Sequence, residues 1–489
     1  MSRGISMNSK MFVSPKFYLM QLIFNITAIS FFCLFCHTSL AALSFAATTT
    51  QYIHGNPPEI LESADTKILN GIQFKLNIDG LDPVIVLPGT DNKISVAYNT
   101  SPSIYSFGVD TSSLNDSDIN DVDGDKVATT GSFIIQSINT EWRDSNNNII
   151  PSDSTSQLGS DVCNSSTANA KSSVKVTIQF VAKTQYGAPD QSEPREVSKT
   201  FQVSADDGIC YIRPGVLALI MHNGWDEGDN YAPYGADTID LDVPYNVDQF
   251  TMHKGFKASA KDQNGNYFPT YGFPDARFRI VPVNPISDYS YTLVKNPNNS
   301  LISASRDSSA DSKSEFKFTE NVPAQDNKFV ILVTNNRTLA QFYYTFSIKH
   351  WLYFTNNLVG NWQNANSYCQ NNNDRLPIRA ELSNSSFATV PTTNDNYYVK
   401  NNGYRRAIGE GLLPEWGKAY FYSPLDYIGR DMMSGAPNLR SLINYDFYFT
   451  SEPSSVKDVL GNYRYYSVGM VEGNIIVEPD VAYTLCVKY

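Results

Sequence analysis

Apolar and polar residues alternate along much of this 489-residue sequence. The pattern is clear in GIQFKLNI at residues 71–78, in VKVTIQFV at 174–181 and in QFYYTFSI at 341–348. A period of two places the apolar side chains on one face of a β-strand, where a sheet can bury them. Clusters of Gly, Pro, Asn and Asp separate these runs, as turns do. The sequence therefore predicts a mainly β fold, and its length predicts two or three domains.

The first 46 residues have the layout of a secretory signal peptide. A basic stretch without acidic residues precedes an apolar run at 17–35, and small-residue cleavage sites follow, ending at Ala41 and Ala46. An uncleaved anchor is the alternative. We predict residues 1–46 to be a signal peptide and the mature chain to be secreted or on the cell surface, with the periplasm as the alternative.

The charge balance bears on the class of partner. The net charge is −12, and removing the signal peptide, which holds three positive and no negative charges, lowers it to −15. An acidic surface repels phosphate backbones and anionic lipids. We therefore expect no nucleic-acid partner.

Two of the six cysteines lie in the predicted signal peptide, and the mature chain keeps Cys163, Cys210, Cys369 and Cys486. An even number of cysteines in an exported protein indicates disulfides, and four cysteines allow three pairings. We predict Cys163–Cys210 and Cys369–Cys486, which place one disulfide in each half of the chain.

The β pattern divides into regions. In residues 47–212 the pattern predicts six or seven short strands. Because this number of strands suits an immunoglobulin-like fold, we predict a β-sandwich of that class. The segment ICYIRPG at 209–215 marks a boundary. Residues 213–345 are a second β-rich region, either a separate domain or an extension of the first.

One helical segment interrupts the β pattern, in NWQNANSYCQNNNDRLPIRAEL at residues 361–382. Trp362, Ala365 and the pair Tyr368–Cys369 fall on one stripe of a short helix. The Asn run ends this helix, and the following Pro can open a second short helix. A disulfide from this helix to the last strand would fix the two together, so we predict a looped α+β module at 346–489.

Several motifs of this region resemble those of known folds. A helix ending in Tyr-Cys, an Arg-Leu-Pro followed by Glu-Leu, and a closing strand with Cys near the chain end resemble a C-type-lectin-like domain. The wider set, in order within residues 215–489, is FPTYGFPDARF, YTFSIKHWLYF, WQNANSYCQNNNDRLPIRAEL, LLPEWGKAYFY, YDFYFTSE, YRYYSVGMVEGN and YTLCVKY. Together they resemble the adhesion domain of the invasin and intimin family of Gram-negative surface adhesins.

The resemblance implies an adhesin that binds a protein or glycan receptor on a host or neighbouring cell through its C-terminal lectin-like domain. Sugar-binding C-type lectins hold Ca²⁺ through a Glu-Pro-Asn loop and a Trp-Asn-Asp strand. Here Glu452-Pro453 is followed by Ser454, and no Trp-Asn-Asp occurs. The Ca²⁺ site is therefore not implied. Family members commonly carry further domains that this sequence does not match, so the means of surface attachment stays open.

The segment LLPEWGKAYFY at 412–422 is the best binding candidate, because it falls where lectin-like folds have a long loop. Its aromatic rings could stack on sugars or anchor a protein contact, or could fill the domain core instead. The two adjacent arginines at 405–406 could meet an acidic partner or be solvated, and the Trp at 225 could face a ligand or be buried in a turn. The candidate binding residues are Trp416, Glu415, Tyr420, Tyr422, Tyr404, Arg405, Arg406 and Trp225.

The segment NDSDINDVDGDK at 115–126 has the composition of a calcium loop. Aligning Asp121 and Asp123 with the third and fifth positions of an EF-hand puts Ile119 first and Thr130 twelfth, where acidic ligands are required. We expect a solvated acidic loop, with an irregular Ca²⁺ site as the alternative, and predict no metal site.

No HExxH, GxSxG, P-loop or GxGxxG motif occurs in the sequence. We therefore predict a protein without enzymatic activity or cofactor. Two alternatives stay open: an exported carbohydrate-active enzyme on a β scaffold, and an extracellular structural subunit that bridges partners.

Overall fold

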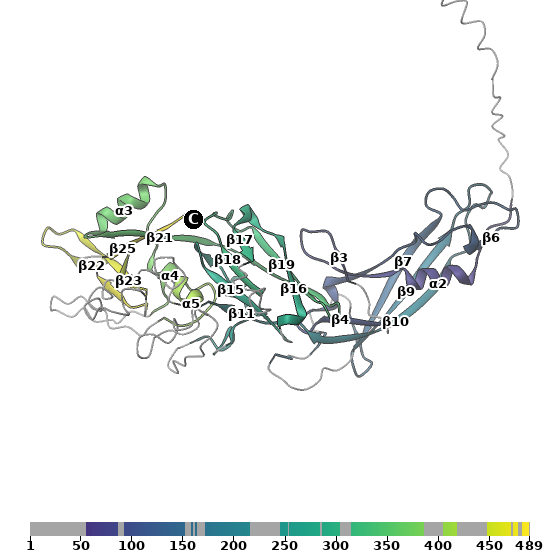
Figure 1. The fold of residues 1–489 in the computed structure, drawn as a ribbon, viewed down its shortest axis with the longest axis horizontal. Helices are drawn as coiled ribbons and strands as arrows, with labels where there is room; N and C mark the ends of the chain where they lie inside the picture. The colour runs from purple at the N-terminus through teal and green to yellow at the C-terminus, as the bar shows by residue number, and fades with distance from the viewer. Residues whose placement is uncertain are drawn as a thin grey trace, which may run out of the picture.

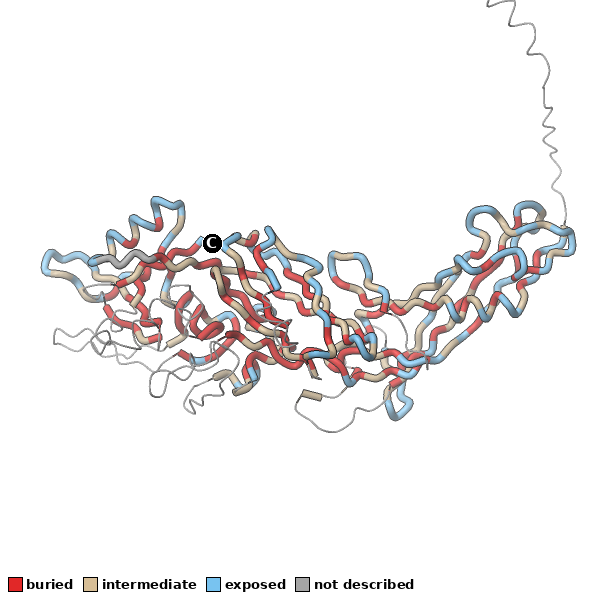
Figure 2. The backbone as a smooth tube through the Cα atoms, viewed as in Figure 1, coloured by how far each residue is buried: buried red, intermediate tan, exposed pale blue. Residues whose placement is uncertain are grey.

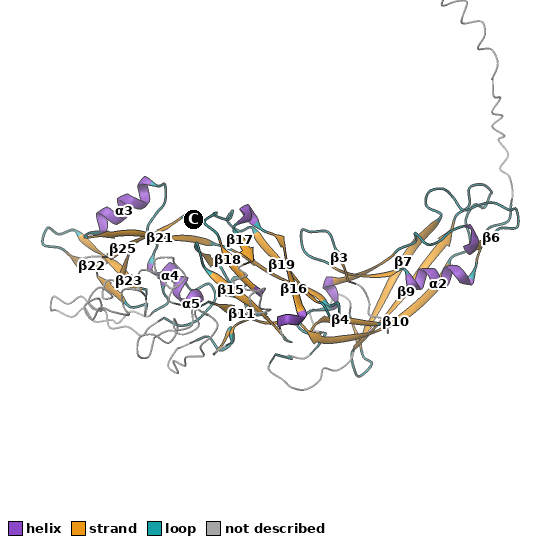
Figure 3. Ribbon diagram, viewed as in Figure 1, coloured by secondary structure: helices purple, strands orange, loops and turns teal. Residues whose placement is uncertain are grey.

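The alternating segments pair into β-sheets along an elongated molecule (Figure 1). The computed structural model describes residues 55–86, 92–151, 158–159, 162–163, 172–215, 245–252, 254–283, 286–303, 314–385, 404–417, 447–470, 473–477 and 482–488. The predicted signal peptide lies outside these residues. Strands dominate and helices are few (Figure 3), which confirms the predicted mainly β fold with a small α+β part. No helix in the described part of the chain is long and apolar enough to cross a bilayer.

The described residues of the N-terminal part form two facing groups of strands, one α-helix and two short 3-10 helices, η1 (Pro102–Ile104) and η2 (Asp116–Asp118). The smaller sheet has the order β3 (Val84–Val86), β2 (Ile72–Leu76), β5 (Tyr105–Val109), all antiparallel. The larger sheet has the order β4 (Lys93–Ala97), β10 (Arg195–Asp207), β9 (Ser172–Ala182), β7 (Phe133–Arg143), β8 (Ile149–Ile150). Helix α2 (Glu62–Asn70) and the pair β1 (Glu59–Ile60) and β6 (Ile119–Asn120) complete this part.

One apolar core joins these two sheets. It contains the buried rings of Phe74, Trp142, Phe180 and Phe201, together with aliphatic side chains from the same strands. Strand β2 buries every second residue, as its alternation predicts.

The middle of the molecule is a second pair of sheets. A six-stranded sheet has the order β12 (Phe250–Thr251), β13 (Gly255–Lys257), β11 (Ile209–Pro214), β15 (Arg277–Pro282), β18 (Glu315–Phe318), β17 (Leu301–Ser303). A three-stranded sheet has the order β16 (Tyr289–Lys295), β19 (Lys328–Asn335), β20 (Gln341–Ser347). The proposed seam at residue 212 falls inside β11, which belongs to the six-stranded sheet.

The described residues of the C-terminal part form a six-stranded sheet and three short α-helices. The strand order is β14 (Tyr271–Gly272), β21 (His350–Val359), β25 (Ala482–Val487), β22 (Phe447–Lys457), β23 (Tyr463–Gly469), β24 (Ile475–Val477). The helices are α3 (Trp362–Asn371), α4 (Arg379–Leu382) and α5 (Leu412–Trp416). The first two lie in the segment where the sequence predicts two short helices.

The middle and C-terminal parts share one core. The same cluster of buried residues contains Phe278 and Phe346 from the middle sheets, and Trp351, Trp416 and Leu485 from the C-terminal part. Strand β14 also leaves the middle segment of the chain to pair with β21 of the C-terminal sheet. The three units at 47–212, 213–345 and 346–489 remain a proposal, and the last two are continuous in their packing.

Candidate functional site

The C-terminal part lies at the opposite end of the molecule from the N-terminal sandwich (Figure 1). Its helix α3 begins at an Asn cap, because Asn361 Oδ1 accepts the Asn364 N–H at 2.9 Å. A disulfide joins Cys369 of this helix to Cys486 of the last strand, and a second joins Cys163 to Cys210. Both predicted pairings are therefore confirmed.

The helix is held to the sheet by more than the disulfide. Its first residue, Trp362, stacks on Tyr465 of β23 with ring centroids 3.5 Å apart, and its Nε1 donates to the Thr450 carbonyl at 2.7 Å. Cys369 packs in a small buried cluster with Ala365, on the same helix stripe. The α3 surface is consequently fixed relative to strands β22 and β23.

The Arg-Leu-Pro turn after α3 is organised by a buried carboxylate. Glu381 accepts from Arg375 through both oxygens, at 2.7 and 2.5 Å, and its Oε1 lies 3.2 Å from His350 Nδ1. The Ile378 N–H donates to the same carboxylate at 2.9 Å. Burial opposes ionisation, but these partners outweigh it and lower the pKa of Glu381 to about 2. The turn is thus a structural ion cluster that connects α4 to β21.

A second buried carboxylate fastens α5. Glu415 accepts the N–H of Thr270 at 2.9 Å, the Thr270 hydroxyl at 2.6 Å and the N–H of Tyr271 at 3.0 Å. It also accepts the N–H of Gly409 at 2.9 Å. Burial raises the pKa of Glu415 to about 7, although these donors favour the ionised form. The carboxylate ties the 404–417 segment to the strand β14.

Four of the candidate binding residues are buried, which corrects their assignment to a contact surface. Trp416, Glu415, Tyr404 and Arg406 each have no exposed surface. The Trp416 Nε1 donates to the Tyr271 carbonyl at 2.8 Å. The Arg406 guanidinium lies over the Phe250 ring, 5.2 Å from its centroid.

The physical reason is packing. All five residues of α5 are buried, and Leu412, Leu413 and Trp416 fill the core that the middle and C-terminal sheets share. The core-filling alternative holds for these residues. Arg405 keeps a half-exposed side chain, paired with Glu410 at 3.1 Å. Trp225, Tyr420 and Tyr422 lie outside the described residues.

The described surface of the C-terminal part presents a different apolar feature. The turn between β22 and β23 carries Val459, which is fully exposed, and Leu460, which is 82% exposed. Tyr463 follows at 55% exposure, with Lys457 Nζ 4.5 Å from its ring centroid. We call residues 457–463 the hairpin tip. It lies at the end of the molecule farthest from the N-terminal sandwich and is exposed in Figure 2.

The hairpin tip has a fixed conformation. Asp458 Oδ1 accepts the N–H groups of Leu460 and Asn462, at 2.9 and 2.8 Å, and the Asp458 N–H donates to the Asn462 carbonyl at 2.8 Å. Gly461 adopts φ +86°, which favours glycine. The sequence analysis did not identify this site. A signal was available in the segment DVLGN at 458–462, where two aliphatic residues lie among the turn-forming residues Asp, Gly and Asn.

The acidic loop at 115–126 uses its carboxylates within the fold. Asp121 Oδ1 accepts the N–H of Asp123 at 2.9 Å, and Asp123 Oδ2 accepts the N–H of Asn56 at 2.6 Å. Across the residues that the structure describes, no three His, Cys, Asp or Glu side chains gather in a way that could hold a metal ion.

Comparison with known proteins gives matches among solved structures. No family model and no curated protein match the chain. The crystal structure of invasin, a bacterial integrin-binding protein, matches with a TM-score of 0.34 and 13% identity over 85% of this chain. This chain spans 65% of that invasin structure.

Two intimin structures also match. A C-terminal 282-residue fragment of intimin, solved with the intimin-binding domain of its translocated receptor Tir, has a TM-score of 0.29 and 12% identity. The match covers 81% of this chain and 97% of the fragment. The Int190 fragment of intimin from enteropathogenic E. coli has a TM-score of 0.23 and 12% identity, over 49% of this chain and 94% of its own. These structures belong to the adhesin family that the sequence motifs resemble.

Proposed function

We propose that this chain is an exported adhesin without enzymatic activity, which binds a receptor on a host or neighbouring cell through its C-terminal part. The motifs in residues 215–489, in one order along the chain, support the adhesin class. The observation that carries the proposal is the hairpin tip, which presents Val459 and Leu460 at one end of an elongated molecule.

The chemistry of the hairpin tip favours a protein receptor over a glycan. Fully burying one large aliphatic side chain contributes about 1.5–3 kcal/mol, so the pair supplies enough for a specific contact. A turn whose backbone N–H groups are held by Asp458 loses little backbone conformational entropy on binding. The receptor surface that suits the hairpin tip is therefore an apolar cleft in a protein, which could accept the Val459 and Leu460 side chains.

The test is saturable binding of the mature chain, residues 47–489, to a panel of cultured cells. Replacing Val459 and Leu460 together by Asp should weaken binding by on the order of 100-fold, since both apolar contacts are lost. The matched control is Val122→Asp, a 74%-exposed valine of the N-terminal part, which should bind as the parent does.

Other outcomes contradict the proposal. Equal binding by the V459D/L460D variant and its parent would remove the hairpin tip from the contact. Cleavage of a polysaccharide by the mature chain without cell binding would favour the carbohydrate-active alternative. Co-purification with a bridging partner, again without cell binding, would favour a structural subunit.

A further inference from the structure

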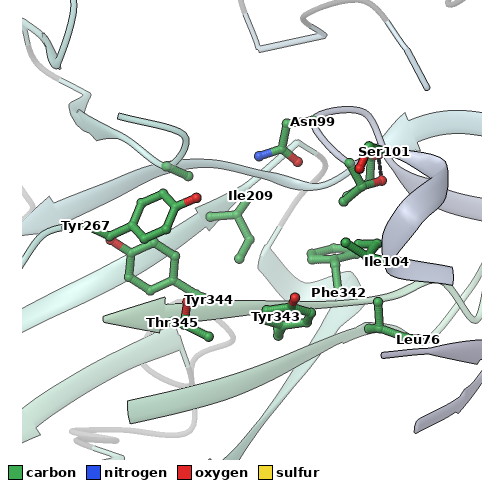
Figure 4. A pocket seen from close by; sticks show the side chains of 13 residues that line it. Leu76, Asn99, Ser101, Ile104, Ile209, Tyr267, Phe342, Tyr343, Tyr344 and Thr345 are labelled. Carbon is green, nitrogen blue, oxygen red and sulfur yellow. Dashed lines mark hydrogen bonds between the residues drawn. The ribbon is translucent and has the colours of Figure 1, made fainter. Parts of the chain in front are cut away.

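A cavity of about 190 Å³ lies where the N-terminal sandwich meets the middle sheets (Figure 4). The sandwich contributes Leu76, Asn99 and Ser101 to its wall. The middle part contributes Tyr267 and Tyr343, among others. An apolar cavity of about 150 Å³ is enough for one benzene ring, so this cavity has room for a single six-membered ring.

The junction around the cavity is held rigidly. The Cys163–Cys210 disulfide crosses it, joining the sandwich to strand β11. Buried Asp207, at the end of β10, accepts the Tyr289 hydroxyl at 2.8 Å and the Asn335 amide at 2.7 Å, both from the middle part. The two walls therefore stand in a fixed relation, and the cavity exists before any ligand arrives.

The wall combines flat rings with neutral polar groups. Of the described residues that line it, none carries a charge, in a protein with 18% charged residues. Tyr267, Phe342 and Tyr343 supply aromatic surface. Figure 4 shows the Tyr267 hydroxyl and the Asn99 amide on the same side of the space.

Three of these polar groups are available to a ligand. Among the described residues, no hydrogen bond engages the Asn99 amide, the Tyr267 hydroxyl or the Tyr343 hydroxyl, and all three residues are half-buried. In contrast, the Tyr344 hydroxyl donates to the Phe268 carbonyl, and the Thr100 hydroxyl donates to the Ala97 carbonyl at 2.6 Å. The available set contains both donors and acceptors.

We infer that this cavity binds one ring of a neutral carbohydrate. A sugar ring presents an apolar C–H face, which suits the tyrosine and phenylalanine rings, and hydroxyl groups, which suit the amide and the phenolic oxygens. A purely apolar ligand would leave the three polar groups without partners at a cost. No cationic side chain is among the described lining residues, although Lys261 Nζ lies 4.7 Å from the centroid of the Tyr267 ring, so the neutral and anionic sugars are compared in the test. The site is separate from the hairpin tip and does not depend on the proposed receptor binding.

Saturation-transfer NMR on the mature chain tests the inference, with methyl glycosides of glucose, galactose, mannose and N-acetylglucosamine as probes. A ring of about a dozen non-hydrogen atoms with ordinary ligand efficiency should bind with a Kd on the order of 1 mM. Disaccharides that carry the bound ring at either end then distinguish a free sugar from the end of a glycan chain.

Two variants locate the site. Asn99→Leu and Tyr267→Phe each remove one hydrogen-bonding group at nearly constant volume and should weaken sugar binding about tenfold. Tyr186→Phe, at a 66%-exposed tyrosine outside the cavity, is the matched control and should bind as the parent does. Unchanged thermal midpoints show that each variant is folded. The V459D/L460D variant should keep full sugar binding.

The inference is overturned if none of the four glycosides gives a saturation signal at tens of millimolar. It is also overturned if the signal survives both cavity variants unchanged. Preferential binding of glucuronic acid or benzene over the neutral glycosides would contradict the neutral-sugar assignment.

Discussion

Glu415 and Glu381 are two buried carboxylates whose pKa values move in opposite directions. Burial raises the pKa of Glu415 to about 7, above the ordinary value of 4.5. The folded state therefore holds this proton more tightly than the unfolded chain, and the resulting stabilisation is full below pH 4.5 and lost as the pH rises through 7. Glu381, with a pKa lowered to about 2 by its partners, stabilises above pH 4.5 and loses that contribution as the pH falls towards 2.

The Glu415 shift predicts a pH dependence of stability. The free energy of unfolding of the parent, relative to Glu415→Gln, should be larger at pH 5 than at pH 8 by up to roughly 3 kcal/mol, because glutamine cannot gain or lose the proton. Denaturant unfolding at both pH values measures this difference. The control is Glu410→Gln, which replaces the carboxylate paired with the half-exposed Arg405. The unfolding free energy of the parent relative to this control should be nearly the same at pH 5 and at pH 8. A parent and a Glu415→Gln variant with parallel pH profiles would show that Glu415 does not titrate in this range.

The burial of individual aromatic residues was the part that the sequence could not decide. The segment LLPEW has four apolar residues and one carboxylate, and such a composition fits an exposed binding loop or a core helix equally well. The answer depends on Thr270, Tyr271 and the Phe rings around Trp416, which lie about 145 positions earlier in the chain. Side chains so distant in sequence give no local signal.

The disulfide between α3 and β25 belongs to the scale of elements. It closes a loop of 117 residues, for which the chain-entropy model gives a stabilisation of up to about 5 kcal/mol. Removing it by replacing Cys369 and Cys486 with Ser should release α3 from the sheet. Hydrogen–deuterium exchange should then rise in α3 and β25 and stay unchanged in β9 and β10 of the N-terminal sandwich.

The other disulfide provides the matched control. Replacing Cys163 and Cys210 with Ser should raise exchange at β11 and leave α3 protected. If α3 stays as protected without its disulfide as with it, the contacts of Trp362 and the packing of Ala365 are enough to hold the helix, and the covalent link is dispensable.

Local sequence patterns predict the strands and the helix α3, but they do not predict the exposure of the hairpin tip. β2 and β20 alternate in burial as they alternate in sequence, and α3 carries Ala365 and Cys369 on its buried face. The exposure of Val459 arises because the turn projects beyond the sheet, which depends on how far β22 and β23 extend past their neighbours. Sequence alone does not set that length.

The whole molecule is elongated, and the N-terminal, middle and C-terminal parts pack differently at the two junctions between them. The core of the N-terminal sandwich extends to Val330 of the middle strand β19, whereas the middle and C-terminal sheets share one large cluster of buried residues. The mainly β class was predictable from the alternation of apolar residues, and both disulfides from the even number of cysteines and their division between the two halves of the chain. The shared core was not, because β14 joins a sheet whose other strands come much later in the sequence.

The central claim is that recognition takes place at the end of the molecule that carries the hairpin tip. Photo-crosslinking tests it directly, with a photoreactive amino acid placed at Leu460 or, as the control, at Val122 of the mature chain bound to cells. We predict one covalent adduct with a receptor protein from position 460 and none from position 122. An adduct from position 122 with none from position 460 would contradict the claim.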